Sequence, residues 1–186
     1  MNKQKQDQLI ILPKLMEQLP GCSFIRTTLT TTQVNLGDIN GPSTKIIIDS
    51  GSDITLVSPE AIDSMHSPLK VHQGKQVQLS QVTAKTTISG YVDLPLIFTT
   101  DQGPIQADVE AYIVKGMSTP LILGNDFADQ YSLSIIRNNG KSLLKFANTR
   151  RMMKLENSTS DSHVNQEVQA FLAKVKKLKH KVRYGI

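Results

Sequence analysis

The chain is poor in cysteine, tryptophan and histidine, the residues from which disulfides, metal sites and many other sites are built. It contains one cysteine, Cys22, and no tryptophan, and aromatic residues make up only 5% of its 186 residues. A single cysteine excludes an internal disulfide and a thiolate metal cluster, and it is typical of a small buried apolar side chain. The four histidines, His66, His72, His163 and His180, show no ligand spacing. We therefore predict no metal and no other cofactor.

Long apolar runs are also missing. No segment reaches membrane-spanning length, and the run from Leu9 to Leu12 is too short for a secretory signal. We therefore expect an intracellular protein without a membrane partner. A Gly-rich phosphate loop, a nucleophile elbow and a CxxC motif are absent as well, which disfavours the chemistries that need them.

Charge is distributed unevenly along the chain. Residues 1–140 hold ten Lys/Arg and thirteen Asp/Glu, a balance of −3, whereas residues 141–186 hold eleven and three, a balance of +8; together they give the net +5. The basic character therefore belongs to the last quarter of the chain, and an argument for nucleic-acid binding applies only there.

The most informative stretch runs from Ile46 to Thr55. Three consecutive isoleucines predict a strand buried on both faces, and the strand delivers Asp49 into the polar turn Ser50-Gly51-Ser52-Asp53. A carboxylate at the inner end of such a strand needs hydrogen bonds or a partner that shares its charge. By itself Asp-Ser-Gly is more often an ordinary turn than a catalytic loop.

A second stretch, residues 121–127, favours the catalytic interpretation of Asp49 over an ordinary turn. It is another apolar strand, followed by Gly124 and by a polar pair suited to the start of a short helix. Asp49-Ser50-Gly51, followed by a hairpin region and then by Ile122-Leu123-Gly124-x-Asp126, resembles the retropepsins, the aspartic proteases of retroviruses and LTR retrotransposons. The greatest likeness is to the Gypsy-type retrotransposon enzymes, and it extends from about Phe24 to about Phe146.

The resemblance implies a role for each residue of the loop. Asp49 would be the catalytic carboxylate, Ser50 would link two active-site loops, Gly51 would present backbone to substrate, and Asp53 would bind the substrate main chain. Ser52 stands where viral enzymes usually carry Ala, and we expect it to donate to the catalytic acids and to favour a more acidic working range.

The second motif and the hairpin receive roles from the same resemblance. Gly124 and Asp126 would be structural. Asn125 replaces an Arg that pairs with the Asp53 equivalent in several retroviral enzymes, so that ion pair is not available here. A flap closing over the peptide is expected at Gln81, Val82, Thr83, Ala84, Lys85 and Thr86, although its tip has no glycine.

Peptide hydrolysis of this kind uses two carboxylates that share a proton, and the chain has one Asp-Ser/Thr-Gly motif. The active form implied is therefore a homodimer in which each copy contributes Asp49 across a twofold axis. The substrate would be an extended peptide or polyprotein, cut in the cytoplasm or in a virus-like particle.

The fold class predicted is all-β. It is a retropepsin-like closed barrel with one short C-terminal helix, plus a separate C-terminal amphipathic helix. The expected strands lie in residues 24–36, 45–48, 54–57, 77–79, 88–98, 104–113, 121–123, 133–136 and 143–146, with helical turns at 58–62 and 127–131.

The domain organisation predicted has four parts: an N-terminal extension (1–21), a protease domain (22–148), a linker (149–162) and a basic amphipathic helix (163–186). The basic helix is suited to a neighbouring polyprotein domain or to nucleic acid. Two alternative functions remain open: a barrel that has lost hydrolysis and serves as a dimerisation or peptide-binding module, and a barrel that only presents the basic helix.

Overall fold

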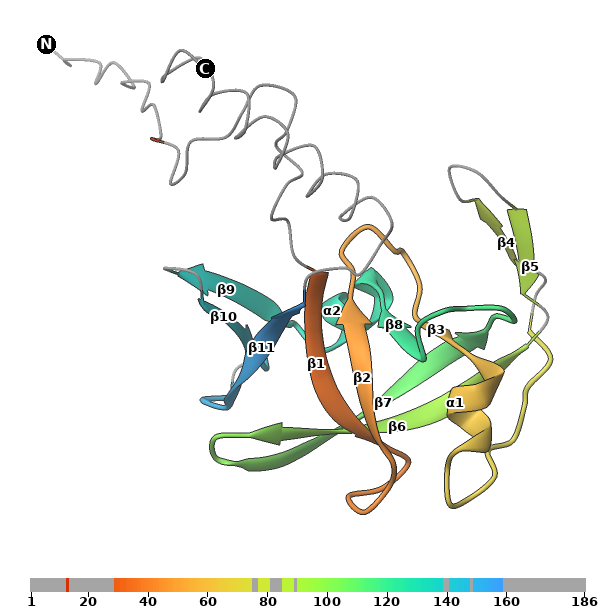
Figure 1. Cartoon of the computed structure of the whole chain (residues 1–186), viewed down its shortest axis with the longest axis horizontal. Helices are drawn as coiled ribbons and strands as arrows, with labels where there is room; N and C mark the ends of the chain where they lie inside the picture. The colour runs from red at the N-terminus through yellow and green to blue at the C-terminus, as the bar shows by residue number, and fades with distance from the viewer. Residues whose placement is uncertain are drawn as a thin grey trace, which may run out of the picture. The chain divides into compact units, whose positions relative to one another are not determined.

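Strands dominate the structure, a computed structural model that describes Pro13 and residues 29–74, 77–80, 85–88, 90–138, 141–147 and 149–158 (Figure 1). The described elements are β1 (Leu29–Leu36), β2 (Ser43–Ile48), β3 (Leu56–Val57), α1 (Pro59–Asp63), β4 (Val77–Ser80), β5 (Lys85–Ile88), β6 (Tyr91–Thr100), β7 (Gly103–Ile113), β8 (Leu121–Leu123), α2 (Asn125–Gln130), β9 (Ser134–Asn138), β10 (Lys141–Lys145) and β11 (Met152–Ser158). Neither described helix is long and apolar enough to cross a bilayer.

Six strands close into a barrel. The sheet order runs β2-β8-β3-β7-β6-β1, and a further pairing between β1 and β2 joins the two ends. Strand β1 makes this closure possible because Thr31–Asn35 pair with β2 while Asn35 and Leu36 pair with β6. A closed sheet leaves no free edge along the ring, and it confirms the predicted all-β barrel.

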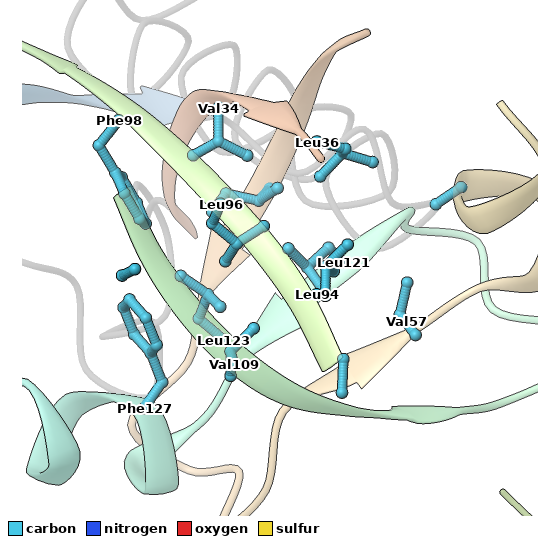
Figure 2. Close-up of a cluster of buried hydrophobic side chains, with 14 of the residues drawn as sticks. Val34, Leu36, Val57, Leu94, Leu96, Phe98, Val109, Leu121, Leu123 and Phe127 are labelled. Atoms are coloured by element: carbon cyan, nitrogen blue, oxygen red, sulfur yellow. The ribbon is translucent and has the colours of Figure 1, made fainter. Parts of the chain in front are cut away.

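The core fills the barrel with aliphatic and aromatic side chains. Alternate residues of β6, including Val92, Leu94, Leu96 and Phe98, are fully buried, as the period-2 pattern of the sequence predicts. Figure 2 shows Leu94, Leu96 and Phe98 meeting side chains of β1, β7, β8 and α2 between the strands. Phe98 stacks on Phe127 of α2 with ring centroids 5.8 Å apart, so the helix is held against the core.

Both short helices lie close to where the sequence places them. Helix α1 begins after Ser58, whose hydroxyl accepts a hydrogen bond from Ala61 N at 3.1 Å, with Pro59 at the first helical position. Helix α2 spans Asn125–Gln130 and therefore starts two residues before the expected span 127–131.

The predicted linker is wrong for residues 152–158, which form β11. This strand pairs with both β1 and β10, and it buries Met153 and Leu155 in the core. The strands predicted at residues 133–136 and 143–146 are present as β9 and β10, which pair with each other, and β11 follows them in the same sheet. The reason is that a polar segment with alternating apolar residues can complete a sheet when a neighbouring strand offers hydrogen bonds.

The two strands predicted on either side of the expected flap, residues 77–79 and 88–98, are only partly correct as the two arms of one hairpin. Strand β4 pairs with β5, and the hairpin projects away from the barrel strands in Figure 1. The second arm ends at Ile88, because Val92–Phe98 belong to barrel strand β6, paired with β7. Lys85 and Thr86 lie in β5 itself, opposite Ser80 and Leu79, and not in the tip. Residues 81–84, the N-terminal extension apart from Pro13, and the basic segment 163–186 lie outside the described residues.

Candidate active site

The acid loop leaves the end of β2 between two neighbouring strands. Asp49 follows Ile48 directly, and its backbone N–H donates to Leu123 O of β8 at 3.0 Å. Strands β2 and β8 run parallel here, with Ile47 opposite Ile122 and Ile48 opposite Leu123. The acid is therefore positioned by a barrel pairing and not by the loop alone.

The turn that follows is organised around the Asp49 carboxylate. Gly51 N donates to Asp49 Oδ1 at 2.9 Å, and Ser52 N donates to Asp49 O at 3.2 Å. A Cβ added at Gly51 would lie 3.2 Å from Asp49 Oδ1, a tight contact, so glycine suits the close approach of backbone to the acid.

Asp49 is exposed in the single chain, as are Ser50, Gly51 and Asp53. The expectation that its strand is buried on both faces is correct only for Ile46, because Ile47 and Ile48 are half-buried. The barrel thus presents the carboxylate at its surface, where another molecule can reach it.

Ser52 does not take the role expected for it. Its Oγ lies 2.7 Å from Ile54 O, and a carbonyl oxygen can only accept, so the hydroxyl proton is donated to Ile54. A serine hydroxyl has one proton. The expected donation from Ser52 to the catalytic acids is therefore wrong, and the side chain instead fixes the exit of the loop.

The two sequence motifs meet through Thr55 and Asp126. Thr55 is fully buried, and its N–H and Oγ1 donate to the two carboxylate oxygens of Asp126 at 2.9 and 2.8 Å. Thr55 Oγ1 also accepts from Gly124 N at 3.2 Å, and Asp126 Oδ1 accepts from Phe127 N at 2.8 Å. This network ties the acid loop to the start of α2. Sequence reasoning missed Thr55, although a threonine between two apolar strand residues needs a polar partner when it is buried.

Position 124 requires glycine because there is no room for a side chain, and not because its backbone needs a positive φ. A Cβ at this position would lie 2.6 Å from the backbone C and O atoms of Ile54. The backbones of the two motifs are therefore in contact at this point. Main-chain bonds continue the contact, since Asn125 N donates to Ser52 O at 2.8 Å and Asp126 N donates to Asp53 O at 3.1 Å.

The side chain of Asn125 bonds to its own acid loop. Its Nδ2 donates to Ser50 O at 2.9 Å, so the amide fixes the backbone of the acid loop next to Asp49. Asparagine at this position cannot form the ion pair with Asp53 that an arginine would form. Its side chain donates a hydrogen bond to the acid loop instead.

A small apolar cluster lies beside the loop. Leu56, Ile88 and Val114 are buried together, and the half-buried side chains packed on them are Ile54, Tyr112, Met117 and Ile122. Members of the cluster come from the strand after the acid loop, from the hairpin and from the second motif. The cluster therefore joins the base of the hairpin to the surroundings of Asp49.

The base of the β4–β5 hairpin is closed by His72 and Tyr91. Their backbones exchange two hydrogen bonds of 2.8 and 3.1 Å, and their rings stack with centroids 5.1 Å apart. His72 Nε2 also lies 3.4 Å from Asp93 Oδ2. These contacts fix the point at which the hairpin leaves the barrel.

Comparison with solved structures places this architecture among retroviral protease-like domains. The retroviral protease-like domain of Ddi1 from Leishmania major superimposes with a TM-score of 0.50 at 14% identity, covering 73% of this chain and 98% of that domain. The EIAV protease complexed with the inhibitor HBY-793 gives a TM-score of 0.43 at 14% identity, covering 59% of this chain and 93% of that one. No family model and no curated protein matches the sequence. The similarity to the Ddi1 domain shows a retropepsin-like fold.

Proposed function

We propose that the protein is a homodimeric aspartic endopeptidase of a Gypsy-type LTR retroelement, which cuts polyprotein in the cytoplasm or in a virus-like particle. The observation that carries the proposal is the exposed Asp49 carboxylate, held at the end of a barrel strand by the N–H of Gly51. A second Asp49 from another copy can approach such a group directly, and two neighbouring carboxylates are what hydrolysis of this kind needs.

The reaction follows from the two acids sharing one proton. The ionised carboxylate takes a proton from a water molecule, whose oxygen bonds to the carbonyl carbon of the peptide, while the protonated carboxyl gives its proton to the carbonyl oxygen. The tetrahedral intermediate then collapses: one of its two hydroxyl groups gives its proton to the ionised carboxylate, the C–N bond breaks, and the protonated carboxyl gives its proton to the amide nitrogen. The carboxylic acid and the amine are released, and one proton remains on the acid pair for the next cycle.

The substrate is an extended chain with apolar side chains near the cut. Ile54 follows the loop directly, and Ile122 lies opposite Ile47 of the strand that carries Asp49; both are half-buried in one apolar cluster with Met117, and this cluster is assigned to the apolar side chains of the substrate. Asp53, exposed at the end of the loop, is assigned to the substrate main chain. The β4–β5 hairpin is assigned the role of a flap that covers the bound peptide.

The test compares Asp49→Asn with the wild-type chain on a library of peptides from acid to neutral pH. We expect Asp49→Asn to reduce cleavage by about a thousandfold or more, since it removes the general base. Asp129→Asn, an exposed aspartate on α2, serves as the matched control and should retain activity. A wild-type dimer that cuts no peptide would instead favour the non-hydrolytic binding module.

A further inference from the structure

Strands β10 and β11 differ in charge from the strands before them. Residues 141–158, which hold these two strands and the turn between them, contain five Lys/Arg and one Asp/Glu, a balance of +4. Residues 29–140 contain six and eleven, a balance of −5. The positive charge of this part of the chain is therefore concentrated on one segment, and the partner that such a segment attracts is acidic.

The register of the two strands places three lysines on the solvent face. Lys141 and Lys145 are exposed in β10, where Leu144 between them is buried. Lys154 is exposed in β11, opposite Leu143. Residues two apart in a strand share a face, so Lys154 is a diagonal neighbour of both other lysines. Like charges in such positions repel one another, and a bound anion relieves this repulsion.

Carboxylates of the chain do little to neutralise this face. Glu156, the acid of β11, lies 3.8 Å from Lys45 of β2, and the other ion pair in the described part of the chain is at His72. The three lysines therefore have no carboxylate partner among the described residues. Both remaining segments are basic in sequence, residues 1–28 with a balance of +2 and residues 159–186 with +4, so neither supplies the missing negative charge.

An apolar groove of about 520 Å³ opens on the same face. Its walls are Leu143, Met152, Met153 and Lys154 of β10 and β11, together with Thr99 and Asp101 at the turn from β6 to β7. The turn is attached to β11 by two hydrogen bonds, because Asp101 N donates to Met152 O at 3.2 Å and Met152 N donates to Asp101 Oδ1 at 3.1 Å. The groove is therefore part of the folded barrel.

We propose that this surface binds an acidic segment of a partner protein. The basic surface, as we call it, consists of Lys141, Leu143, Lys145, Met152 and Lys154. A large apolar side chain of the partner occupies the groove, where methionine side chains adapt to its shape. Carboxylates on either side of that side chain meet the lysines. The inference goes beyond the proposed function and does not depend on Asp49.

A protein segment fits the basic surface better than a nucleic acid does. The residues that line the groove include no aromatic ring and no arginine on which a base could stack. Asp101 also lines the groove, and its carboxylate repels phosphate, whereas it can accept a hydrogen bond from a peptide N–H.

The experiment measures the fluorescence anisotropy of a fluorescein-labelled peptide in which glutamates flank a central pair of leucines. It is titrated with the full chain carrying Asp49→Asn, so that the probe is not cut. We expect a dissociation constant in the micromolar range. A peptide with serines in place of the leucines should bind more weakly, because it leaves the groove empty, and one with lysines in place of the glutamates should not bind.

Three variants of that chain locate the binding. Lys154→Glu replaces an attraction with a repulsion and should raise the dissociation constant about tenfold or more. Lys70→Glu is the matched control: Lys70 is exposed between α1 and β4, the net charge changes equally, and the constant should stay within about twofold. Leu143→Thr suits a strand and should weaken the leucine peptide about fivefold, but not the serine peptide. Unfolding midpoints verify that each variant is folded.

Several results would overturn the inference. One is that the chain without further substitution does not bind the leucine peptide at about 1 mM. Equal weakening by Lys154→Glu and Lys70→Glu would show only an effect of net charge. An unchanged constant in Lys154→Glu would place the peptide elsewhere on the chain.

Two further results would assign the surface to another occupant, and the inference would then fall. The first is binding of labelled oligouridine that Lys154→Glu weakens, with no binding of the leucine peptide. The second is self-association in ultracentrifugation without peptide that Lys154→Glu abolishes, which would identify a second copy. None of these results bears on cleavage by Asp49, so the proposed function is tested separately.

Discussion

Thr55 Oγ1 lies 2.8 Å from Asp126 Oδ1, although 71 residues separate the two in the chain. Thr55 is fully buried, and the bond joins the segment after the acid loop to the first turn of helix α2. The position of the candidate acid therefore depends on a hydroxyl that lies outside both sequence motifs, Asp49-Ser50-Gly51 and residues 122–126.

Replacing Thr55 with Val should destabilise the fold by about 1–3 kcal/mol, because valine keeps the shape but leaves Gly124 N without its acceptor and removes one of the two hydrogen bonds that Asp126 Oδ1 accepts. Urea unfolding measures the difference. Thr55→Ser retains the hydroxyl and should lose less. Equal stability of Thr55→Val and the wild type would show that the network contributes nothing.

Gly124→Ala should disturb the site more than an ordinary glycine substitution does. Its Cβ would meet the backbone of Ile54 at 2.6 Å, which forces the two motifs apart, and we expect a loss of about 3 kcal/mol or more together with reduced cleavage. Gly116→Ala is the control: Gly116 has a φ of +77° and open space around it, so only a conformational cost of about 1–2 kcal/mol applies. Thermal unfolding and cleavage assays on both variants test the contrast.

Ser52→Ala should leave the pH dependence of cleavage unchanged. The hydroxyl proton is donated to Ile54 O and not to Asp49, so its removal affects the loop exit rather than the ionisation of the acids. A pH–rate profile of the variant provides the measurement. A displaced acidic limb, with an unaltered unfolding midpoint, would restore the role that the sequence suggests for Ser52.

The hydrogen bond to Glu110, followed by burial and by the charge of Glu110, raises the pKa of Tyr112 from 10.0 to about 12. The folded state holds this proton more tightly than the unfolded state, so the resulting stability is complete below pH 10 and is lost as pH rises toward 12. We expect Tyr112→Phe to remove this part of the alkaline loss of stability. Spectrophotometric titration of Glu110→Gln should show the Tyr112 pKa returning toward 10.0, and an unchanged titration would contradict the assignment.

Leu155→Ala tests whether β11 is part of the domain. Leu155 is buried between β10 and the core, so its truncation should cost about 2–4 kcal/mol. Lys154, its exposed neighbour in the same strand, should tolerate Ala within about 0.5 kcal/mol. If both substitutions are equally harmless, residues 152–158 behave as the linker that their composition suggests.

The sequence by itself determined the features that depend on neighbouring residues. The strand expected at residues 104–113, the helical turn expected at 58–62 and the polar turn expected after Ile48 are present as β7, α1 and the acid loop. Each of these follows from local geometry, because side-chain direction repeats every two residues in a strand and capping groups act within one helical turn.

Only the tertiary structure decided which segments meet. The closure of β1 on β2, the addition of β11 beside β1, the contact between Thr55 and Asp126, and the exposure of Asp49 all depend on pairings between distant parts of the chain. Thr31 and Glu156, for example, share a hydrogen bond across 125 residues. Such contacts are selected by the packing of the whole barrel, and hydrophobic periodicity within a segment carries no information about its partner strand.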